Sequence, residues 1–370
     1  MTKIVLHIAE AAGGVERYLL TLLGKLKMYK ELEHILVCSV TFDTQKFKGL
    51  VKSVIVVKEM RNAISLSDFK SVFVVRKIIK QYSPNVIYCH SSKAGAIGRL
   101  ANIGIKNNLI YNAHGWSFNM KMLSWHKSVL YQLVERLLAM LTDKIVCISE
   151  YERISALEHN ICKDDKLVVI NNGIDFDENK RIIPKTRKDL GIPSDSFVVG
   201  TIGRLCVQKA PDVFINMAKL VKEQISNAFF VMVGDDISGG NFRENTEKQI
   251  HSLGLDDCVI ITGWVDEPLD YIGLFDVGVL LSRWEGFGLV LLEYMYMGKP
   301  IVASNADAIP YVVGNAGILC DIDNYESAAN SVIRLYEDEE LRSRITREGN
   351  ERVKLFDSCK TAEMTRMLLS

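Results

Sequence analysis

Short runs of β-branched and other apolar residues alternate along the chain with longer segments in which apolar positions recur every three or four residues. The runs are typical of buried strands, and the longer segments of amphipathic helices. In the first half we expect strands at 3–8, 34–40, 53–58, 85–88, 109–112, 144–148 and 167–170, and helices at 15–29, 68–82, 93–102 and 124–141. This alternation predicts a parallel sheet with helices on both faces.

A polar, proline-containing linker near 175–195 interrupts the pattern, which then resumes with expected strands at 198–202, 229–233, 259–261, 277–281 and 300–303. We therefore predict an α/β protein of two Rossmann-like, doubly wound parallel-sheet domains, 1–178 and 179–355. The last helix, 340–355 or beyond, and a helical segment at 356–370 are expected to pack back on the first domain. Because ligands bind beyond the carboxyl ends of such strands, two facing domains would share an interdomain cleft.

The composition agrees with two folded domains, since 48% of the 370 residues are hydrophobic. Residues 1–180 contain 25 Lys and Arg against 17 Asp and Glu, whereas the remainder contains 20 against 28. The basic half suits phosphate-bearing or anionic-lipid partners, and the acidic half argues against a nucleic-acid-binding protein.

The eight cysteines show no Cys-x-x-Cys spacing, so neither a zinc site nor a disulfide framework is indicated. The apolar run near the first residue is short and contains His7 and Glu10, which fits a strand better than a signal peptide. No window reaches the roughly 18 apolar residues that a membrane-spanning helix needs. We expect a cytoplasmic protein whose membrane contact, if any, is peripheral.

The segment 282–300 places two glycines and two acids at the turn between an expected strand and helix. Gly286 and Gly288 allow the backbone to approach a ligand closely, and the free amides at the start of the helix suit a diphosphate. Carboxylates repel phosphate, so we expect Glu285 to accept a hydrogen bond from a sugar hydroxyl and Glu293 from a ribose. The segment alone equally fits an acid that stabilises a helix amino end and a surface carboxylate.

The pattern Ser-x-x-Glu-Gly-Phe-Gly-Leu-Val-x-Leu-Glu in this segment resembles the Glu-x7-Glu signature of family-4 retaining glycosyltransferases, which have the GT-B fold. Further landmarks of that family follow in the same order along nearly the whole chain. The resemblance implies a catalytic role for one residue of the segment, Glu285. It implies donor binding by five more, which are Gly286, Phe287, Gly288, Leu289 and Glu293.

Arg204 and Lys209 lie five residues apart in a loop after an expected strand. Two cations can straddle a diphosphate and stabilise the negative charge that grows on it as the bond to the sugar breaks. The alternative is a pair of solvated surface cations. In the resembled family two such residues bind the diphosphate, and Gly203 beside them also contacts the donor. Ala210 departs from that family, which usually has glycine there.

Gly13 and Gly14 resemble the family's Gly-Gly loop, which contacts the phosphates or the transferred sugar, although alone they fit an ordinary tight turn. They do not form a Gly-x-Gly-x-x-Gly dinucleotide fingerprint, which disfavours an oxidoreductase. His114 ends another expected strand. A single histidine is usually structural, but the resemblance maps His114 onto a histidine that binds the donor sugar or stabilises the reacting centre.

Gly263 and Trp264 match a family segment whose backbone meets the nucleotide base, and a simple turn is the alternative. Tyr311 stands where the family has glutamate after a proline, which changes details of the donor site. The charged residues named above are intact, so we expect an active enzyme.

Asp-x-Asp occurs at 175–177 and 321–323, a spacing that holds a divalent ion in other transferases. Neither pair lies with the phosphate-binding glycines, and the two loop cations already supply positive charge. We therefore expect no metal and no other cofactor. If both glutamates bind hydroxyls, neither is free to be a nucleophile, which favours attack on the face that the diphosphate leaves.

The first domain carries basic and aromatic residues that suit contact with an anionic membrane. They are Lys25, Lys27, Lys30, Arg76, Lys77, Lys80, Trp116, Phe118, Met120, Lys121, Met122, Leu123, Trp125 and Lys127. The alternative is a set of solvated helix faces with a loop packed on its own domain.

Together these features predict a retaining hexosyl- or N-acetylhexosaminyltransferase that uses a nucleotide-diphosphate sugar, with UDP as the favoured nucleotide. The expected acceptor is a hydroxyl of a polyprenyl-diphosphate-linked glycan in bacterial capsule or O-antigen synthesis, at the inner face of the cell membrane. The alternatives are the same chemistry on a soluble acceptor and a non-catalytic nucleotide-sugar-binding protein.

Overall fold

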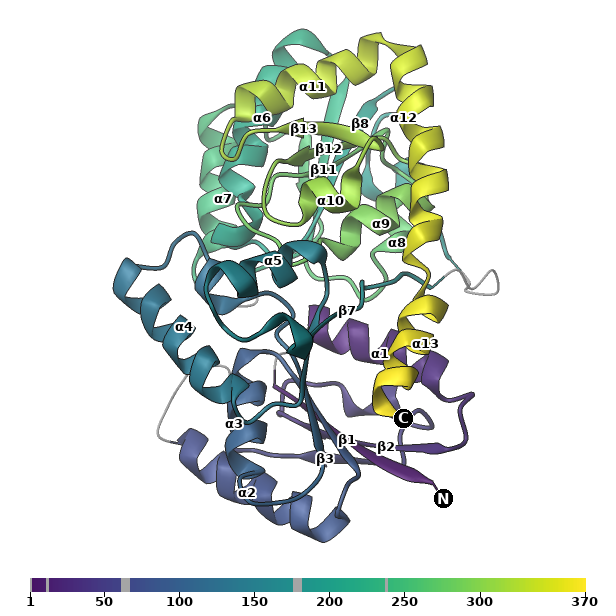
Figure 1. Cartoon of the computed structure of the whole chain (residues 1–370). Helices are drawn as coiled ribbons and strands as arrows, with labels where there is room; N and C mark the ends of the chain where they lie inside the picture. Colours follow the sequence, from purple (N-terminus) through teal and green to yellow (C-terminus); the bar gives the residue numbers. More distant parts are fainter. Residues whose placement is uncertain (1, 11–12, 61–66, 176–181, 237–238) are drawn as a thin grey trace. The chain divides into compact units, whose positions relative to one another are not determined.

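The computed structural model describes residues 2–370 except 11–12, 61–66, 176–181 and 237–238, and it consists of two compact units. Unit 1 comprises Met1–Asp175 and Asp357–Ser370, and unit 2 comprises Phe176–Phe356. The expected boundary at 178 and the first part of the expected linker lie outside the described residues. Each unit is built on one parallel sheet covered by helices (Figure 1).

The sheet of unit 1 has seven strands in the order β3-β2-β1-β4-β5-β6-β7. They are β1 Lys3–Ala9, β2 Leu32–Cys38, β3 Ser53–Val56, β4 Val86–His90, β5 Asn108–Asn112, β6 Lys144–Cys147 and β7 Leu167–Val169. Each of them overlaps a predicted run. The strand order reverses between β1 and β4, where the register pairs Ala9 with His90.

The helices of unit 1 pack on the two faces of this sheet. They are α1 Gly14–Leu26, α2 Ser67–Tyr82, α3 Ser92–Ala101, α4 Trp125–Ala139, α5 Glu150–Glu158 and α13 Ser358–Leu369, with 3-10 turns η1 Thr44–Phe47, η2 Ser117–Asn119 and η3 Asp164–Lys166. Apolar residues of α2, α3, α4 and α5 form one core with the sheet, and those of α1 and α13 form another. The sheet is therefore the middle of three layers.

The carboxyl-terminal helix α13 is part of unit 1 although the chain reaches it through unit 2. Its Thr361 hydroxyl donates a hydrogen bond of 2.8 Å to the carbonyl oxygen of Asn171. Gly173 lies so close to the start of α13 that a Cβ there would be 2.6 Å from the Ser358 nitrogen. The absence of a side chain at Gly173 is what allows this approach.

The sheet of unit 2 has six strands in the order β10-β9-β8-β11-β12-β13. They are β8 Phe197–Ile202, β9 Ala228–Val233, β10 Val259–Ile261, β11 Val277–Leu280, β12 Ile301–Ser304 and β13 Gly317–Cys320. The first five were predicted and β13 was not. The reversal of strand order again falls beside the first strand, between β8 and β11.

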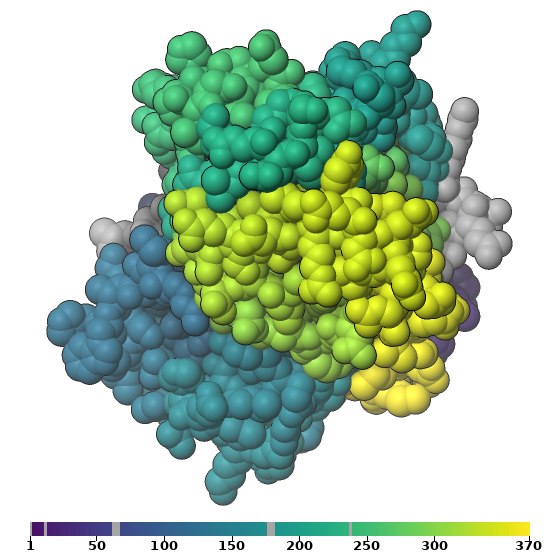
Figure 2. Space-filling view, turned by 90° about the horizontal axis from the view of Figure 1, so that it is seen from above, coloured from purple at the N-terminus to yellow at the C-terminus, as the bar shows by residue number. Residues whose placement is uncertain are grey.

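Helices of unit 2 fall into two groups, in which α6 packs with α7 and α11, and α9 packs with α8, α10 and α12. The elements are α6 Pro211–Gln224, α7 Phe242–Ser252, α8 Leu269–Ile272, α9 Leu289–Tyr296, α10 Ile309–Val313, α11 Tyr325–Glu337, α12 Glu339–Arg352, η4 Arg187–Leu190, η5 Val207–Lys209 and η6 Val353–Phe356. Asp338 ends α11 and caps α12 by accepting a hydrogen bond from the Leu341 amide at 2.8 Å. Figure 2 shows the yellow-green segment that contains α11 and α12 on the surface of unit 2.

Candidate functional site

Two loops of unit 2 meet at the point where its strand order reverses. The loop after β8 begins at Gly203, and the loop after β11 leads to α9. The two strands are neighbours, with Val277 paired to Val199. Ligands of doubly wound sheets bind at the carboxyl ends of the strands at such a point. The topology therefore directs attention to these loops.

A buried carboxylate links the two loops. Glu285 is 7% exposed and forms an ion pair with the Lys209 ammonium through its Oε1 atom. The Ser282 hydroxyl donates a hydrogen bond of 2.9 Å to the same oxygen. Burial strengthens this charge-assisted pair, because little water competes with it. The structure thus brings together two of the predicted catalytic residues.

Arg204 lies on the same loop as Lys209 but is exposed. In the described part of the chain its guanidinium has no hydrogen-bond or ion-pair partner, whereas Lys209 is held by Glu285. One cation is thus fixed by the protein, and the other is available to a ligand. This arrangement can bind a diphosphate with one rigid and one adaptable charge.

Arg283 links the two loops through hydrogen bonds, a role that was not predicted from the sequence. Its backbone amide donates to the Gln208 carbonyl at 2.8 Å and its Nη1 donates to the Val207 carbonyl at 2.9 Å. Its other guanidinium nitrogens bond to Asp212 at 2.6 Å and to Asp323 at 2.7 Å. The only feature of the sequence that pointed to this role is a basic residue three positions after a strand. The partners of Arg283 could not be identified because they are 40 to 76 residues away in the chain.

Glycine is required where the ends of β8 and β9 approach each other. Gly234 has φ +145°, and a Cβ there would lie 2.0 Å from the Gly203 carbonyl oxygen. Gly263 has φ +80° and forms an isolated bridge with Gly234. Three loops therefore converge at this edge, where the predicted donor residues Gly203 and Gly263 both lie against Gly234. Trp264 follows Gly263 and is exposed.

The turn before α9 contains the remaining predicted donor residues. Gly288 has φ +84° and precedes Leu289, the first residue of α9. Phe287 is buried, with its ring 5.6 Å from that of Phe356, so its side chain packs inside unit 2. Glu293 is buried within α9. Gly286 lies in the same turn and is partly exposed.

In unit 1 the structure places His114 near the start of α1, whose first residue is Gly14. Gly13 has φ +88° and precedes this helix. Tyr18, one turn along, has its ring 4.6 Å from that of His114. His114 itself has φ +53°, a left-handed backbone that is uncommon for histidine. Burial lowers its pKa to about 3, so the imidazole is neutral near pH 7.

The predicted aromatic surface is wrong at two positions. Trp116 and Phe118 are only 3% and 4% exposed and belong to the core of unit 1. The indole nitrogen of Trp116 donates to the Glu152 carbonyl at 2.9 Å. Trp125 is 72% exposed, and helix α4 continues from it with an apolar outer face. The exposed apolar residues of this face are Trp125, Leu130, Leu133, Val134 and Leu137, followed by Met140 and Leu141.

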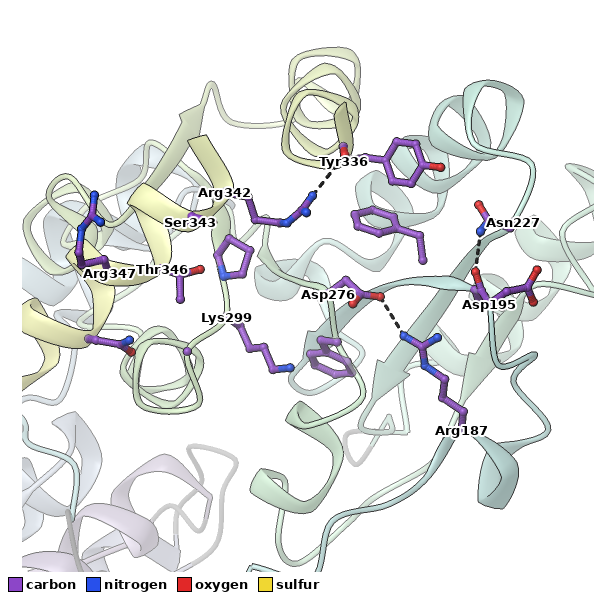
Figure 3. Close-up of a pocket in the computed structure, with 16 residues that line it drawn as sticks. Arg187, Asp195, Asn227, Asp276, Lys299, Tyr336, Arg342, Ser343, Thr346 and Arg347 are labelled. Atoms are coloured by element: carbon purple, nitrogen blue, oxygen red, sulfur yellow. Dashed lines mark hydrogen bonds and ion pairs between the residues drawn. The ribbon is translucent and has the colours of Figure 1, made fainter. Parts of the chain in front are cut away.

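A hollow of about 650 Å³ lies at the opposite edge of the unit 2 sheet (Figure 3). It is bordered by Phe197, which begins β8, and by Asp276 and Pro300, which immediately precede β11 and β12. The Arg187 guanidinium points toward Asp276, with 3.1 Å between Nη2 and Oδ2. Because this is the amino edge of the strands, we do not assign the nucleotide sugar to it.

Among the described residues, no group of three or more His, Cys, Asp and Glu side chains is arranged to hold a metal ion. Asp177 lies outside those residues. Asp323 is engaged by Arg283. Metal independence stays a prediction. In the same part of the chain, the helices all lack the length and hydrophobicity needed to cross a membrane.

Two family models match the chain in succession. The model described as Glycosyltransferase Family 4 matches residues 12–178, and the model described as Glycosyl transferases group 1 matches residues 182–352.

Similar proteins include the UDP-Gal:alpha-D-GlcNAc-diphosphoundecaprenol alpha-1,3-galactosyltransferase of Escherichia coli, which is 29% identical over 76% of this chain and 74% of its own length. An uncharacterized 41.2 kDa protein in the cps region of Klebsiella pneumoniae is 31% identical over 90% of this chain and 88% of its own. Among solved structures, Anabaena HepE in complex with UDP and glucose has a TM-score of 0.83 at 21% identity, over 100% of this chain and 99% of that one.

Proposed function

Because the chain belongs to the family-4 glycosyltransferases, we propose that it transfers a sugar from a UDP-sugar, with retention of configuration, to a hydroxyl of a lipid-diphosphate-linked glycan. The proposed pathway is capsule or O-antigen synthesis. The observation that carries the proposal is the cluster of Lys209, Glu285 and Ser282 where the strand order of unit 2 reverses, with the exposed Arg204 on the same loop as Lys209.

In this proposal the two cations bind the donor's diphosphate. Arg204 can engage phosphate oxygens in a bidentate manner, and Lys209 contributes a point charge whose position is set by Glu285. Negative charge grows on the diphosphate as it leaves, so both cations stabilise the transition state more than the ground state. The amino end of α9 adds backbone amides to this anion site.

Glu285 is assigned a sugar hydroxyl. Lys209 and Ser282 both contact its Oε1 atom, so Oε2 is the oxygen that we assign to the sugar. We assign to Glu293 a hydrogen bond from a hydroxyl of the ribose. With both carboxylates engaged, the acceptor attacks from the face that the diphosphate leaves, and the diphosphate takes the acceptor's proton. His114 is assigned a neutral hydrogen bond to the donor sugar.

The nucleotide and the acceptor are inferred from relatives. HepE was crystallised with UDP, and the name of the Escherichia coli relative specifies a UDP-sugar and a diphosphoundecaprenol-linked acceptor. These names favour a hexose or N-acetylhexosamine carried by UDP. They also favour an acceptor that is anchored in a bilayer.

The outer face of α4 is the surface that we assign to the membrane. Leu137 is 61% exposed, and the helix has one acidic residue, Glu135, which is buried against Arg99 with 2.9 Å between Oε2 and Nη2. Lys121 and Lys127 lie at its amino end. An apolar face flanked by cations and free of exposed acids suits the interface of an anionic leaflet. We place the protein on the inner face of the cell membrane.

A thermal-shift panel of UDP, GDP, ADP and their sugars tests the donor site. A ligand at about 100 times its dissociation constant stabilises the folded state by about 2.7 kcal/mol, so UDP and UDP-sugars should raise the melting temperature. Lys209→Ala should abolish the shift. Arg347→Ala, which removes an exposed arginine at the opposite edge, is the control and should retain it. An equal response to all nucleotides, or none, contradicts the assignment.

Turnover and vesicle binding test the acceptor. The product's anomeric configuration, read by NMR, should match that of the donor, and a soluble sugar phosphate should be a poor acceptor. Leu133→Glu with Leu137→Glu should abolish co-sedimentation with phosphatidylglycerol vesicles. Leu355→Glu changes an equally exposed leucine of unit 2 and should not affect it. Turnover on soluble acceptors alone would support the alternative function.

A further inference from the structure

Four histidines of unit 1 form a continuous chain of side-chain contacts that ends at His114. Nδ1 of His34 lies 3.0 Å from Nε2 of His7. Nδ1 of His7 lies 3.2 Å from Nε2 of His90, and Nδ1 of His90 lies 3.2 Å from Nε2 of His114. The members come from β2, β1 and β4 and from the residues after β5, so the chain crosses neighbouring strands toward the carboxyl edge.

These imidazoles lie in the layer between the sheet and α1, where the surroundings are largely apolar. His7 and His90 are fully buried, and His34 is nearly so. Burial lowers the pKa of all four histidines, so each is neutral and carries one N–H near pH 7. A buried polar group is costly unless it is hydrogen-bonded, and here each imidazole finds its partner in the next one.

Counting protons leaves two arrangements for the chain. Three N···N contacts need one proton each, and four neutral imidazoles supply four, so one proton is left at an end. If it is on Nδ1 of His114, every histidine must be the Nδ1–H tautomer. If it is on Nε2 of His34, every histidine must be the Nε2–H tautomer. The four histidines are therefore either all Nδ1–H tautomers or all Nε2–H tautomers.

The buried end of the chain decides between them. Nε2 of His34 is buried without a hydrogen-bond partner among the described residues. Placing a proton there would create an orphaned buried N–H, which folded proteins rarely tolerate. The Nδ1–H arrangement instead leaves the spare proton on His114, which is partly exposed and can meet a ligand.

We propose that His7 and His90 are positioning residues that hold His114 in its Nδ1–H tautomer, and that His34 only closes the buried end of their chain. His114 then offers an N–H donor, and not a lone pair, to an oxygen of the bound substrate. The identity of that oxygen, on the sugar or the diphosphate of the donor, rests on the proposed function. The tautomer of His114 does not rest on the proposed function.

The chain fixes a tautomer and does not conduct protons from solvent. A proton wire needs an accessible group at both ends, whereas the far nitrogen of His34 is enclosed. Tyr18 and Tyr88 flank the chain, with ring centroids 6.0 Å and 4.2 Å from that of His90, and they limit its rotation. The His90 ring is thereby held between its two histidine neighbours.

Long-range proton–nitrogen NMR on the ¹⁵N-histidine-labelled full chain tests the tautomer directly. We expect His7, His34, His90 and His114 to carry the proton on Nδ1 in the free protein, without substrate or assumption about activity. His90→Leu removes the donor to His114, so the His114 tautomer should become mixed. His90→Asn keeps an N–H at the position of Nδ1 and should restore it.

Kinetics then separate positioning from packing. We expect kcat/KM to fall about tenfold in His90→Leu and to return to within about threefold in His90→Asn, the scale of one hydrogen bond. His34→Leu, two links further away, controls for the loss of a buried imidazole and should leave the His114 tautomer unchanged. An Nε2–H signal from His114 in the unaltered protein overturns the proposal, as does an unchanged tautomer in His90→Leu. An Nδ1–H tautomer of His114 in a protein without transferase activity would contradict only the proposed function.

Discussion

In unit 1 the carboxyl edge of the sheet carries neutral imidazoles, whereas in unit 2 the corresponding edge carries ionised side chains. Both sheets begin with the same order, in which the first strand lies at the point of reversal. At that point unit 1 places His90 and His114, joined by a neutral hydrogen bond. Unit 2 places Lys209 and Glu285, joined by an ion pair.

The comparison shows that overall charge does not locate an anion site. The basic residues are more numerous in the first half of the chain, yet the candidate diphosphate site lies in the acidic second half. What matters is the local field, since charges at distances beyond about 10 Å are largely screened by salt. The excess of cations in the first half of the chain is therefore no evidence that the diphosphate binds there.

The largest expected effect follows from removing the charges of unit 2. Arg204→Ala or Lys209→Ala should raise the barrier to transfer by about 2–4 kcal/mol, the scale of one lost electrostatic partner in the transition state. Steady-state release of UDP measures this loss. Arg347→Ala, at the other edge of the sheet, should retain full turnover. Unchanged turnover in the Arg204→Ala, Lys209→Ala double variant would defeat the assignment.

A smaller loss is expected when the neutral donor of unit 1 is removed. His114→Gly should lower kcat/KM about tenfold, because a neutral hydrogen bond contributes about 1 kcal/mol. Glycine adopts a backbone of φ +53° without strain, so the loss in kcat/KM reports the missing hydrogen bond and not a distorted backbone. His114→Asn also tolerates this conformation and keeps an N–H near Nδ1, so it should recover most of the activity. A loss as large as that of Lys209→Ala would mean that His114 carries charge during the reaction.

Stability should fall with acid because of the histidines in unit 1. Burial lowers the pKa of His34 to about 4 and that of His114 to about 3, whereas an unfolded histidine titrates near about 6.5. Below about pH 6.5 the unfolded chain therefore binds more protons. The free energy of unfolding should drop by up to about 1.4 kcal/mol per pH unit for each buried histidine.

Two carboxyl groups oppose this trend. Burial raises the pKa of Glu10 to about 7 and that of Glu152 to about 8, so they stay protonated in the folded protein and weaken it as pH rises above about 4.5. Between about pH 6.5 and 4.5 the four histidines His7, His34, His90 and His114 outnumber these two carboxyl groups, so the net free energy of unfolding should still fall with acid. Urea unfolding at pH 6.5, 5.5 and 4.5 should show the decline, with a shallower slope in His34→Leu. Constant or rising stability over this range would contradict it.

The smallest effect is expected at Ala210, where the resembled family usually has glycine. Ala210 has φ +50° and ψ +56°, a left-handed conformation that costs about 1–2 kcal/mol for an L-residue. Ala210→Gly relieves this strain, but it removes a buried methyl group and adds chain entropy to the unfolded state. We expect a change within about 1 kcal/mol in a thermal melt. A loss well beyond that would show that the methyl group supports the Lys209 loop.

The sequence by itself determined the α/β class, the two sheets and the candidate donor residues. Strand β9 is a continuous apolar run, which is typical of a parallel strand that is buried on both faces. The Glu-x7-Glu segment could be recognised because its residues are close in the chain. The predicted GT-B fold and family are confirmed, whereas the roles of individual site residues stay predictions.

The tertiary structure alone decided which residues far apart in the chain meet. His7 contacts His90 only because β1 and β4 are neighbours in a particular register, and Arg283 reaches Asp212 only because two loops converge. Burial of Trp116 and exposure of Leu137 likewise depend on how α4 and its loop pack. Periodicity reports which face of an element is apolar, but register and packing fix the partners, and those are properties of the folded chain as a whole.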